Sequence, residues 1–130
     1  MRNKHAAYTL ARLPIGFSFL GHGSIRIPKL SAFAQGMTNS FAETYLPVEL
    51  VKPFALILPF VELLLGIALI IGFKARETAA VGILLICVLI FGCSFQENWS
   101  AIGIQLFYGL YLAILFLFSE YNKGLLSKSN

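Results

Sequence analysis

The stretch Pro59-Phe60-Val61-Glu62-Leu63-Leu64-Leu65-Gly66 places one carboxylate inside an apolar run that extends from about Phe54 to Phe73. A run of roughly 20 apolar residues is long enough for a helix to cross a bilayer. A charge inside such a helix costs about 2.5–3.5 kcal/mol on insertion scales, so we expect Glu62 to face a partner or a wet cavity. The arrangement of the rest of the chain decides which groups Glu62 meets.

The composition is that of an integral membrane protein. The 130 residues are 58% hydrophobic and 12% charged, and the mean hydropathy is +0.79, whereas soluble domains carry about 25% charged residues. The length allows four spans in a single domain over residues 1–130. The net charge of +4 comes without a Lys/Arg-rich run. It therefore favours membrane topology and anionic lipid, and not nucleic acid, as its explanation.

The apolar segments predict an all-α fold, an integral membrane four-helix bundle with spans at about 7–24, 50–72, 78–95 and 101–119. Between the first two spans, apolar residues recur every three to four positions at Leu30, Phe33, Met37, Phe41 and Tyr45. This period predicts an extra amphipathic helix over about Pro28–Thr44 that lies at the membrane interface.

The two ends of the chain are expected to lie outside the bundle. Residues Met1–Ala6 form a short basic lead, and the sequence after them lacks a convincing cleavage site, which predicts a retained first span. The polar tail from Glu120 to Asn130 is expected to be partly disordered.

Lys and Arg residues are distributed unevenly between the two sides of the predicted bundle. One side carries Arg2, Lys4, Lys74, Arg76, Lys123 and Lys128, and the other carries Arg26, Lys29 and Lys52, which are balanced by Glu43, Glu49 and Glu97. The positive-inside rule then predicts that both termini lie in the cytoplasm.

The first span carries polar residues on a face that also holds small ones. Arg12, Gly16, Phe19, Gly23 and Arg26 follow helical spacing, which predicts that this face looks inward and packs closely on another helix.

Two partners for Glu62 are predicted from depth at about 1.5 Å per residue. Arg12 reaches Glu62 from the cytoplasmic side, and the resulting ion pair would be structural. His22 reaches it from the outer side and forms a cluster with Gln105 and Tyr108. That cluster would line an outward-facing pocket that binds a polar head group or passes a proton, with Arg26 and Trp99 at its mouth.

Metal and disulfide chemistry are not predicted. His5 and His22 lie far apart in sequence and have no paired cysteines near them, so they do not make a recognisable metal site. Cys87 and Cys93 lie six positions apart in one predicted helix and point to different faces, which excludes a disulfide between them.

Two spaced motifs resemble those of the DoxX family. The first is Arg12-Leu13-x-x-Gly16-x-x-Phe19-x-x-His22-Gly23, and the second is Pro59-x-x-Glu62-x-x-x-Gly66-x-x-Leu69-x-x-Gly72-Phe73 with Arg76 after it. The resemblance implies a small four-span bacterial membrane protein. Some members of that family are subunits of a thiosulfate:quinone oxidoreductase, others are membrane partners in oxidative-stress assemblies, and more distant ones are chaperones or cargo receptors.

Three functions follow as hypotheses. The first is a quinone-linked redox subunit, in which quinone is a bound ligand because no intrinsic cofactor motif is evident. The second is a non-enzymatic membrane partner or chaperone, or a lipid-binding protein, and the third is a small-solute transporter component. A homo-oligomer or a partner membrane or redox protein is compatible with all three, and the sequence leaves open whether the chain is an enzyme.

Overall fold

The computed structural model describes residues 2–123, and over that range it contains helices and no strands. Its elements in chain order are α1 (Arg2–Arg26), the 3₁₀ helix η1 (Ile27–Lys29), α2 (Leu30–Ser40), α3 (Val48–Ile71), α4 (Ala75–Phe95), α5 (Trp99–Leu117) and the 3₁₀ helix η2 (Ser119–Tyr121). Among the described helices, α3, α4 and α5 are each long and apolar enough to cross a membrane, and α1 is not in that group. The predicted all-helical class is therefore confirmed, together with the membrane character of the chain.

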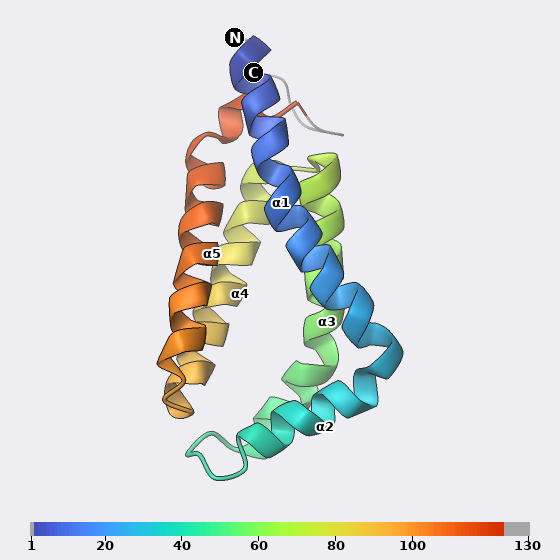
Figure 1. The fold of residues 1–130 in the computed structure, drawn as a ribbon, viewed down its shortest axis with the longest axis vertical. Coiled ribbons are helices and arrows are strands. Elements are labelled where there is room, and N and C mark those ends of the chain that lie inside the picture. Colours follow the sequence, from blue (N-terminus) through green and yellow to red (C-terminus); the bar gives the residue numbers. More distant parts are fainter. Residues whose placement is uncertain (1, 124–130) are drawn as a thin grey trace.

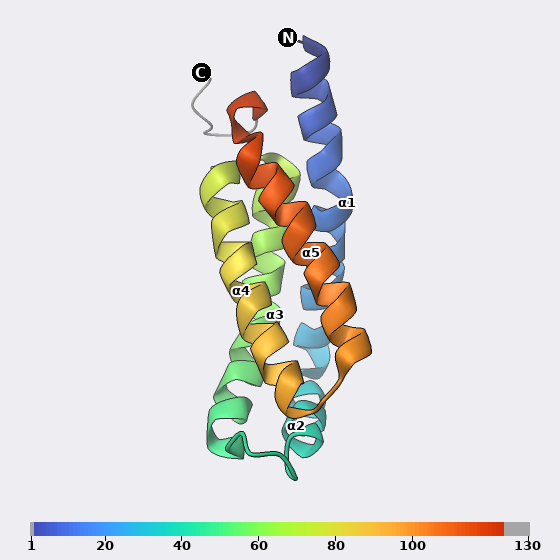
Figure 2. The same cartoon turned by 90° about the vertical axis from the view of Figure 1, so that its left-hand side faces the viewer.

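The four long helices associate as two pairs. α1 packs mainly on α3, and α4 packs mainly on α5 (Figure 1). The beginning of α1 lies beside η2, where the Nδ1 atom of His5 is 2.8 Å from the carbonyl oxygen of Tyr121. The short helix α2 crosses the opposite end of the bundle, as both views show (Figures 1 and 2). The bundle thus has a terminal end and an α2 end.

Small residues allow α1 and α3 to approach closely. A Cβ atom added at Gly23 would lie 2.5 Å from the carbonyl oxygen of Pro59, and one added at Gly16 would lie 2.9 Å from Ile70. Gly66 on α3 faces the backbone of α1 in the same way. Arg12 and Phe19, on the same face of α1, are buried. The prediction that this face of the first helix looks inward is confirmed.

Several helix boundaries differ from those predicted. α1 begins at Arg2 and not near residue 7, because the basic lead is part of the helix and contacts Tyr121 through His5 and Lys4. α4 begins at Ala75, which is buried, and not at residue 78.

The last helix also begins earlier than predicted. α5 begins at Trp99 because the side chain of Asn98 accepts a hydrogen bond from the backbone N–H of Ala101 and caps the helix. It ends at Leu117, two residues before the predicted end near residue 119.

The amphipathic segment after α1 is shorter than its apolar period predicted. α2 ends at Ser40, although the pattern extended to Thr44. Hydroxyl groups bond to nearby carbonyls there: Ser40 Oγ donates to Met37, and Thr44 Oγ1 donates to Phe41. Such local bonds offer the backbone an alternative to the helix.

The polar tail is ordered at its beginning. Asn122 is buried, and its Nδ2 donates a 2.9 Å hydrogen bond to the carbonyl oxygen of Gly72, which is the left-handed residue that ends α3. The predicted disorder of the remaining tail, residues 124–130, falls outside the described residues.

The buried apolar core occupies the terminal end of the bundle. Its members come from all four long helices and include Tyr8, Phe19, Leu69, Ala79 and Leu112. The α2 end is packed differently, because a cavity lies there between the two helix pairs and α2.

Candidate functional site

A cavity of about 840 Å³ lies at the α2 end of the bundle, and all five α-helices contribute to its wall. Most of the lining is apolar and aromatic, and includes Phe33, Phe41, Phe54, Leu58 and Leu89. The polar side chains Arg26, His22, Glu62, Gln105 and Tyr108 share this wall. Ligand sites in proteins commonly have about 300–1,000 Å³ and this mixture of an apolar lining with a few polar groups.

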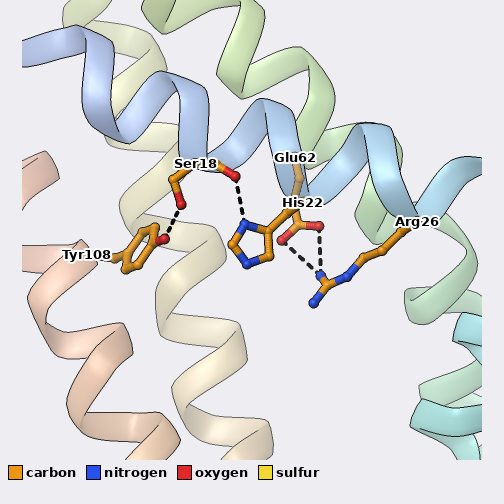
Figure 3. Close-up of polar contacts among 5 residues, drawn as sticks. All are labelled: Ser18, His22, Arg26, Glu62 and Tyr108. Carbon is orange, nitrogen blue, oxygen red and sulfur yellow. Dashed lines mark hydrogen bonds and ion pairs between the residues drawn. The ribbon is translucent and has the colours of Figure 1, made fainter.

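Glu62 forms an ion pair with Arg26. The Nη1 atom of Arg26 donates to both carboxylate oxygens, at 3.0 Å and 3.4 Å, and joins α1 to α3 (Figure 3). The Glu62 side chain is 7% exposed, whereas that of Arg26 is 30% exposed. The two partners predicted for Glu62, Arg12 and His22, are therefore replaced by a residue that was expected at the mouth of the pocket.

Arg26 is held on a third element as well. Its guanidinium carbon lies 4.5 Å from the centre of the Phe33 ring on α2, a distance at which a cation is attracted to the face of an aromatic ring. Because Arg26 is in the last turn of α1, its positive charge also interacts favourably with the partial negative charge of that helix end. The residue thus links α1, α2 and α3 at one side of the cavity.

His22 and Ser18 lie on the same stripe of α1 as Arg26. The Nδ1 atom of His22 is 2.7 Å from the carbonyl oxygen of Ser18, and the imidazole is exposed on the cavity wall. The hydroxyl of Ser18 is hydrogen-bonded to that of Tyr108 on α5 (Figure 3). Sequence reasoning missed Ser18, although its spacing of four residues from His22 was a usable signal.

Gln105 lies on the opposite helix pair. Its Nε2 atom is 3.5 Å from the Sγ atom of Cys93 on α4, and its Oε1 atom is buried and has no hydrogen-bond partner among the described residues. Cys93 also lines the cavity. Sequence reasoning did not place Cys93 beside Gln105, because the two residues lie on different helices and only the pairing of α4 with α5 brings them together.

Arg12 lies apart from the cavity. Its Nη1 atom donates to the carbonyl oxygens of Leu69 and Ile70, at 2.8 Å and 3.3 Å, in the last turn of α3. The residue is 2% exposed. Arg12 therefore satisfies the end of a helix and is not among the cavity-lining residues.

Trp99, which was predicted at the pocket mouth, is also not among the cavity-lining residues. Its side chain is 62% exposed at the first position of α5. An indole at the end of an apolar helix is typical of the membrane interface.

The arrangement suits an amphiphilic molecule better than a small ion. An apolar tail can lie against the aromatic lining, while a polar head group reaches the side chains of α1, α3 and α5. The charge of Glu62 is already compensated by Arg26, so a ligand here need not carry a full charge.

The comparisons with known proteins agree with the motifs of the first two long helices. Neither the curated proteins nor the solved structures gave a significant match. The DoxX family model matches residues 7–94, which is more than half of the chain and includes both motifs. The chain therefore belongs to the DoxX family.

Proposed function

We propose that this protein is a four-span protein of the bacterial inner membrane that binds an amphiphilic ligand, of the size and polarity of a quinone, in the cavity beside Glu62. The first of the four spans is α1, whose 25 residues extend about 37 Å as a helix, longer than a bilayer core of about 30 Å. α1 is less apolar than the other spans, and three of its polar residues have partners or places inside the bundle: Arg12 donates to the end of α3, and His22 and Arg26 line the cavity.

The observation that carries this proposal is a part-buried ion pair on the wall of a largely apolar cavity. Placing Glu62 in an apolar span is costly, and a purely structural helix contact could have used apolar side chains instead. The pair lies among His22, Gln105 and Tyr108, whose side chains are suited to hold a carbonyl or hydroxyl head group.

A quinone-linked redox subunit is the biological role that this site supports best. In such a subunit the protein holds the quinone ring and exchanges protons with it, and a partner protein supplies or removes electrons. Glu62 and His22 are the groups that we assign to proton exchange, because they are the acid and the imidazole on this wall.

The test is ligand binding by the purified protein in lipid nanodiscs. We expect a decyl-tailed benzoquinone to bind, and Glu62→Gln to weaken that binding at least tenfold. The matched control is Glu49→Gln, which makes the same change at an exposed position of the same helix and should leave binding unchanged. If the purified protein binds no quinone, and Glu62→Gln does not alter quinone reduction in membranes, the proposal is wrong.

Lipid binding is the second candidate, favoured by the largely apolar lining of the same cavity. Mass spectrometry of molecules that co-purify with the protein distinguishes the two. A phospholipid that is retained in place of a quinone, and lost with Glu62→Gln, would favour a lipid-binding protein or a partner that presents lipid.

A further inference from the structure

Two groups near the inner part of the cavity have acceptor capacity that no hydrogen bond among the described residues uses. His22 provides the first. A carbonyl oxygen only accepts hydrogen bonds, so the contact between Nδ1 of His22 and the carbonyl of Ser18 requires the proton to be on Nδ1. In the neutral imidazole the other nitrogen, Nε2, then carries a free lone pair, and this ring is exposed on the cavity wall.

Gln105 provides the second acceptor. Its amide nitrogen is directed at Cys93, which leaves its Oε1 atom buried and without a partner among the described residues. A buried carbonyl oxygen without a hydrogen bond costs about 1–3 kcal/mol, so a ligand that donates to it recovers this energy.

The two acceptor residues, His22 on α1 and Gln105 on α5, lie at a similar height along the bundle, on opposite walls of the cavity. Ser18 of α1 and Tyr108 of α5 are hydrogen-bonded to each other, and both helices continue from there toward the α2 end. His22 lies one turn beyond Ser18, and Gln105 lies one turn from Tyr108 in the same direction. His22 and Gln105 thus flank the part of the cavity next to the Ser18–Tyr108 contact.

The strongest donor of the site lies farther out. Arg26 is one turn nearer to the α2 end than His22, and only its Nη1 atom is bonded to Glu62, so its other N–H groups remain donors. The hydroxyls of Ser18 and Tyr108 are bonded to each other, which uses one of their two hydrogens. These donors can bond to a carbonyl oxygen or to a hydroxyl oxygen, whereas the acceptors of His22 and Gln105 are satisfied only by a head group that donates.

We propose that the cavity selects a head group that donates hydrogen bonds, such as a dihydroxy aromatic ring, over the corresponding dione, which can only accept them. His22 Nε2 and Gln105 Oε1 are the specificity-determining acceptors, one for each hydroxyl group. This inference rests on the proposed function, since it concerns the ligand of the same cavity.

The test compares three ligands with the same decyl tail in oxygen-free nanodisc titrations: the benzohydroquinone, the benzoquinone and the dimethyl ether of the hydroquinone. We expect the hydroquinone to bind at least tenfold more tightly than either of the other two. The dimethyl ether keeps the ring and tail but has no hydroxyl hydrogens, so it isolates the contribution of the donors.

Variants assign the preference to the two acceptors. Gln105→Leu is expected to reduce the preference for the hydroquinone to less than threefold, while Gln105→Glu, which keeps an acceptor oxygen, retains it. His22→Phe should reduce the preference as well. Gln35→Leu on the exposed face of α2 is the matched control and should leave the preference intact.

The outcomes separate this inference from the proposed function. Equal binding of all three ligands, or tighter binding of the quinone, overturns the selection of donors and leaves ligand binding in the cavity standing. Absence of binding by every ligand overturns both. A preference for the hydroquinone that persists in both Gln105→Leu and His22→Phe shows that other groups bind the head group. This result overturns the assignment of His22 and Gln105 as the specificity-determining acceptors.

Discussion

Arg12 and Glu62 are both buried charges on the contact between α1 and α3, and each is stabilised in its own way. Glu62 has a cation as its partner, whereas Arg12 donates to carbonyl oxygens of Leu69 and Ile70 in the last turn of α3. The last carbonyls of a helix have no hydrogen-bond partners within the helix, and they carry partial negative charge. A guanidinium at this end donates hydrogen bonds to these carbonyls and compensates their charge.

Replacing Arg12 should therefore destabilise the fold without directly affecting the ligand site. We expect Arg12→Met to lower the free energy of unfolding by about 1.5–3 kcal/mol, because a charge-assisted hydrogen bond to a buried carbonyl is lost. The control is Lys52→Met, at an exposed position of α3, which should change this free energy by less than about 0.5 kcal/mol. Reversible unfolding in mixed detergent micelles measures both, and equal effects would contradict this role for Arg12.

The two members of the ion pair should respond unequally to substitution. Arg26→Gln leaves the carboxylate of Glu62, which is 7% exposed, without its cation. We expect this variant to lower the free energy of unfolding by about 1–3 kcal/mol. Glu62→Gln leaves Arg26, which is 30% exposed, with water and an amide oxygen, so the loss should be smaller.

The double variant Arg26→Gln, Glu62→Gln should be more stable than Arg26→Gln alone, because it no longer buries an unpaired charge. Unfolding free energies of the four proteins in the cycle measure this. A double variant that is less stable than either single variant would show that the pair is not the source of the effect.

The sequence predicted that Glu62 needs a partner, but the two candidates, Arg12 and His22, were both wrong because the partner is Arg26. Side-chain direction explains why. Side chains of a helix tilt toward its N-terminus. α1 and α3 run in opposite directions, so Glu62 tilts toward the α2 end while Arg26 tilts back toward Glu62. Arg12 tilts away from Glu62, toward the end of α3, where it meets Leu69. A comparison of depths alone, without these directions, could not identify Arg26 as the partner.

At the scale of the elements, the contact between α1 and α3 depends on a row of glycines. Gly23 has no room for a Cβ atom, whereas a Cβ atom at Gly21, two residues earlier on the same helix, would have nothing within 4 Å. The two positions provide a matched test of close packing.

We expect opposite signs from the same substitution at these two positions. Gly23→Ala should destabilise the protein by about 1–3 kcal/mol, because the methyl group forces the helix backbones apart. Gly21→Ala should be neutral or stabilise it by up to about 1 kcal/mol, because alanine favours the helix. Unfolding free energies measured side by side decide this, and a loss at both positions would show that helix flexibility, and not contact, is the cause.

The elements were predictable to the extent that local signals determine them. Apolar period and turn residues located all four long helices, and the inward face of α1 followed from the spacing of Gly16 and Gly23. The helix ends were less predictable, because they depend on distant contacts such as the one between His5 and Tyr121. A pocket beside Glu62, His22, Gln105 and Tyr108 was predicted from their depths in the bundle. Its volume and its largely apolar wall were not, since they result from the packing of five helices.

At the scale of the whole molecule, charge distribution predicts the orientation in the membrane. Lys74 lies in the turn between α3 and α4, and Arg76 lies in the first turn of α4, both at the terminal end. The exposed residue Tyr45 lies in the loop after α2, at the other end. The positive-inside rule places the first end in the cytoplasm.

Single cysteines introduced into a protein with Cys87→Ser and Cys93→Ser test this orientation. We expect Tyr45→Cys to react with a membrane-impermeant maleimide in intact cells, because its side chain is 97% exposed at the end that the positive-inside rule places outside. Lys74→Cys should react only after the membrane is permeabilised. The reverse pattern of labelling would invert the proposed topology and place the cavity on the cytoplasmic side.

The pairing of α1 with α3 and of α4 with α5 has a mechanical consequence. The short turn at Gly72, held by Asn122, joins the two pairs at the terminal end, and the cavity lies at the other. A helix of 21 residues such as α4 is about 31 Å long. A rotation of one pair by about 5° about the turn thus moves the far end by about 2.7 Å, on the helix length just given. Changes in lateral pressure or bilayer thickness that are too small to alter helix packing near the turn would therefore change the width of the cavity, and with it the affinity for the proposed ligand.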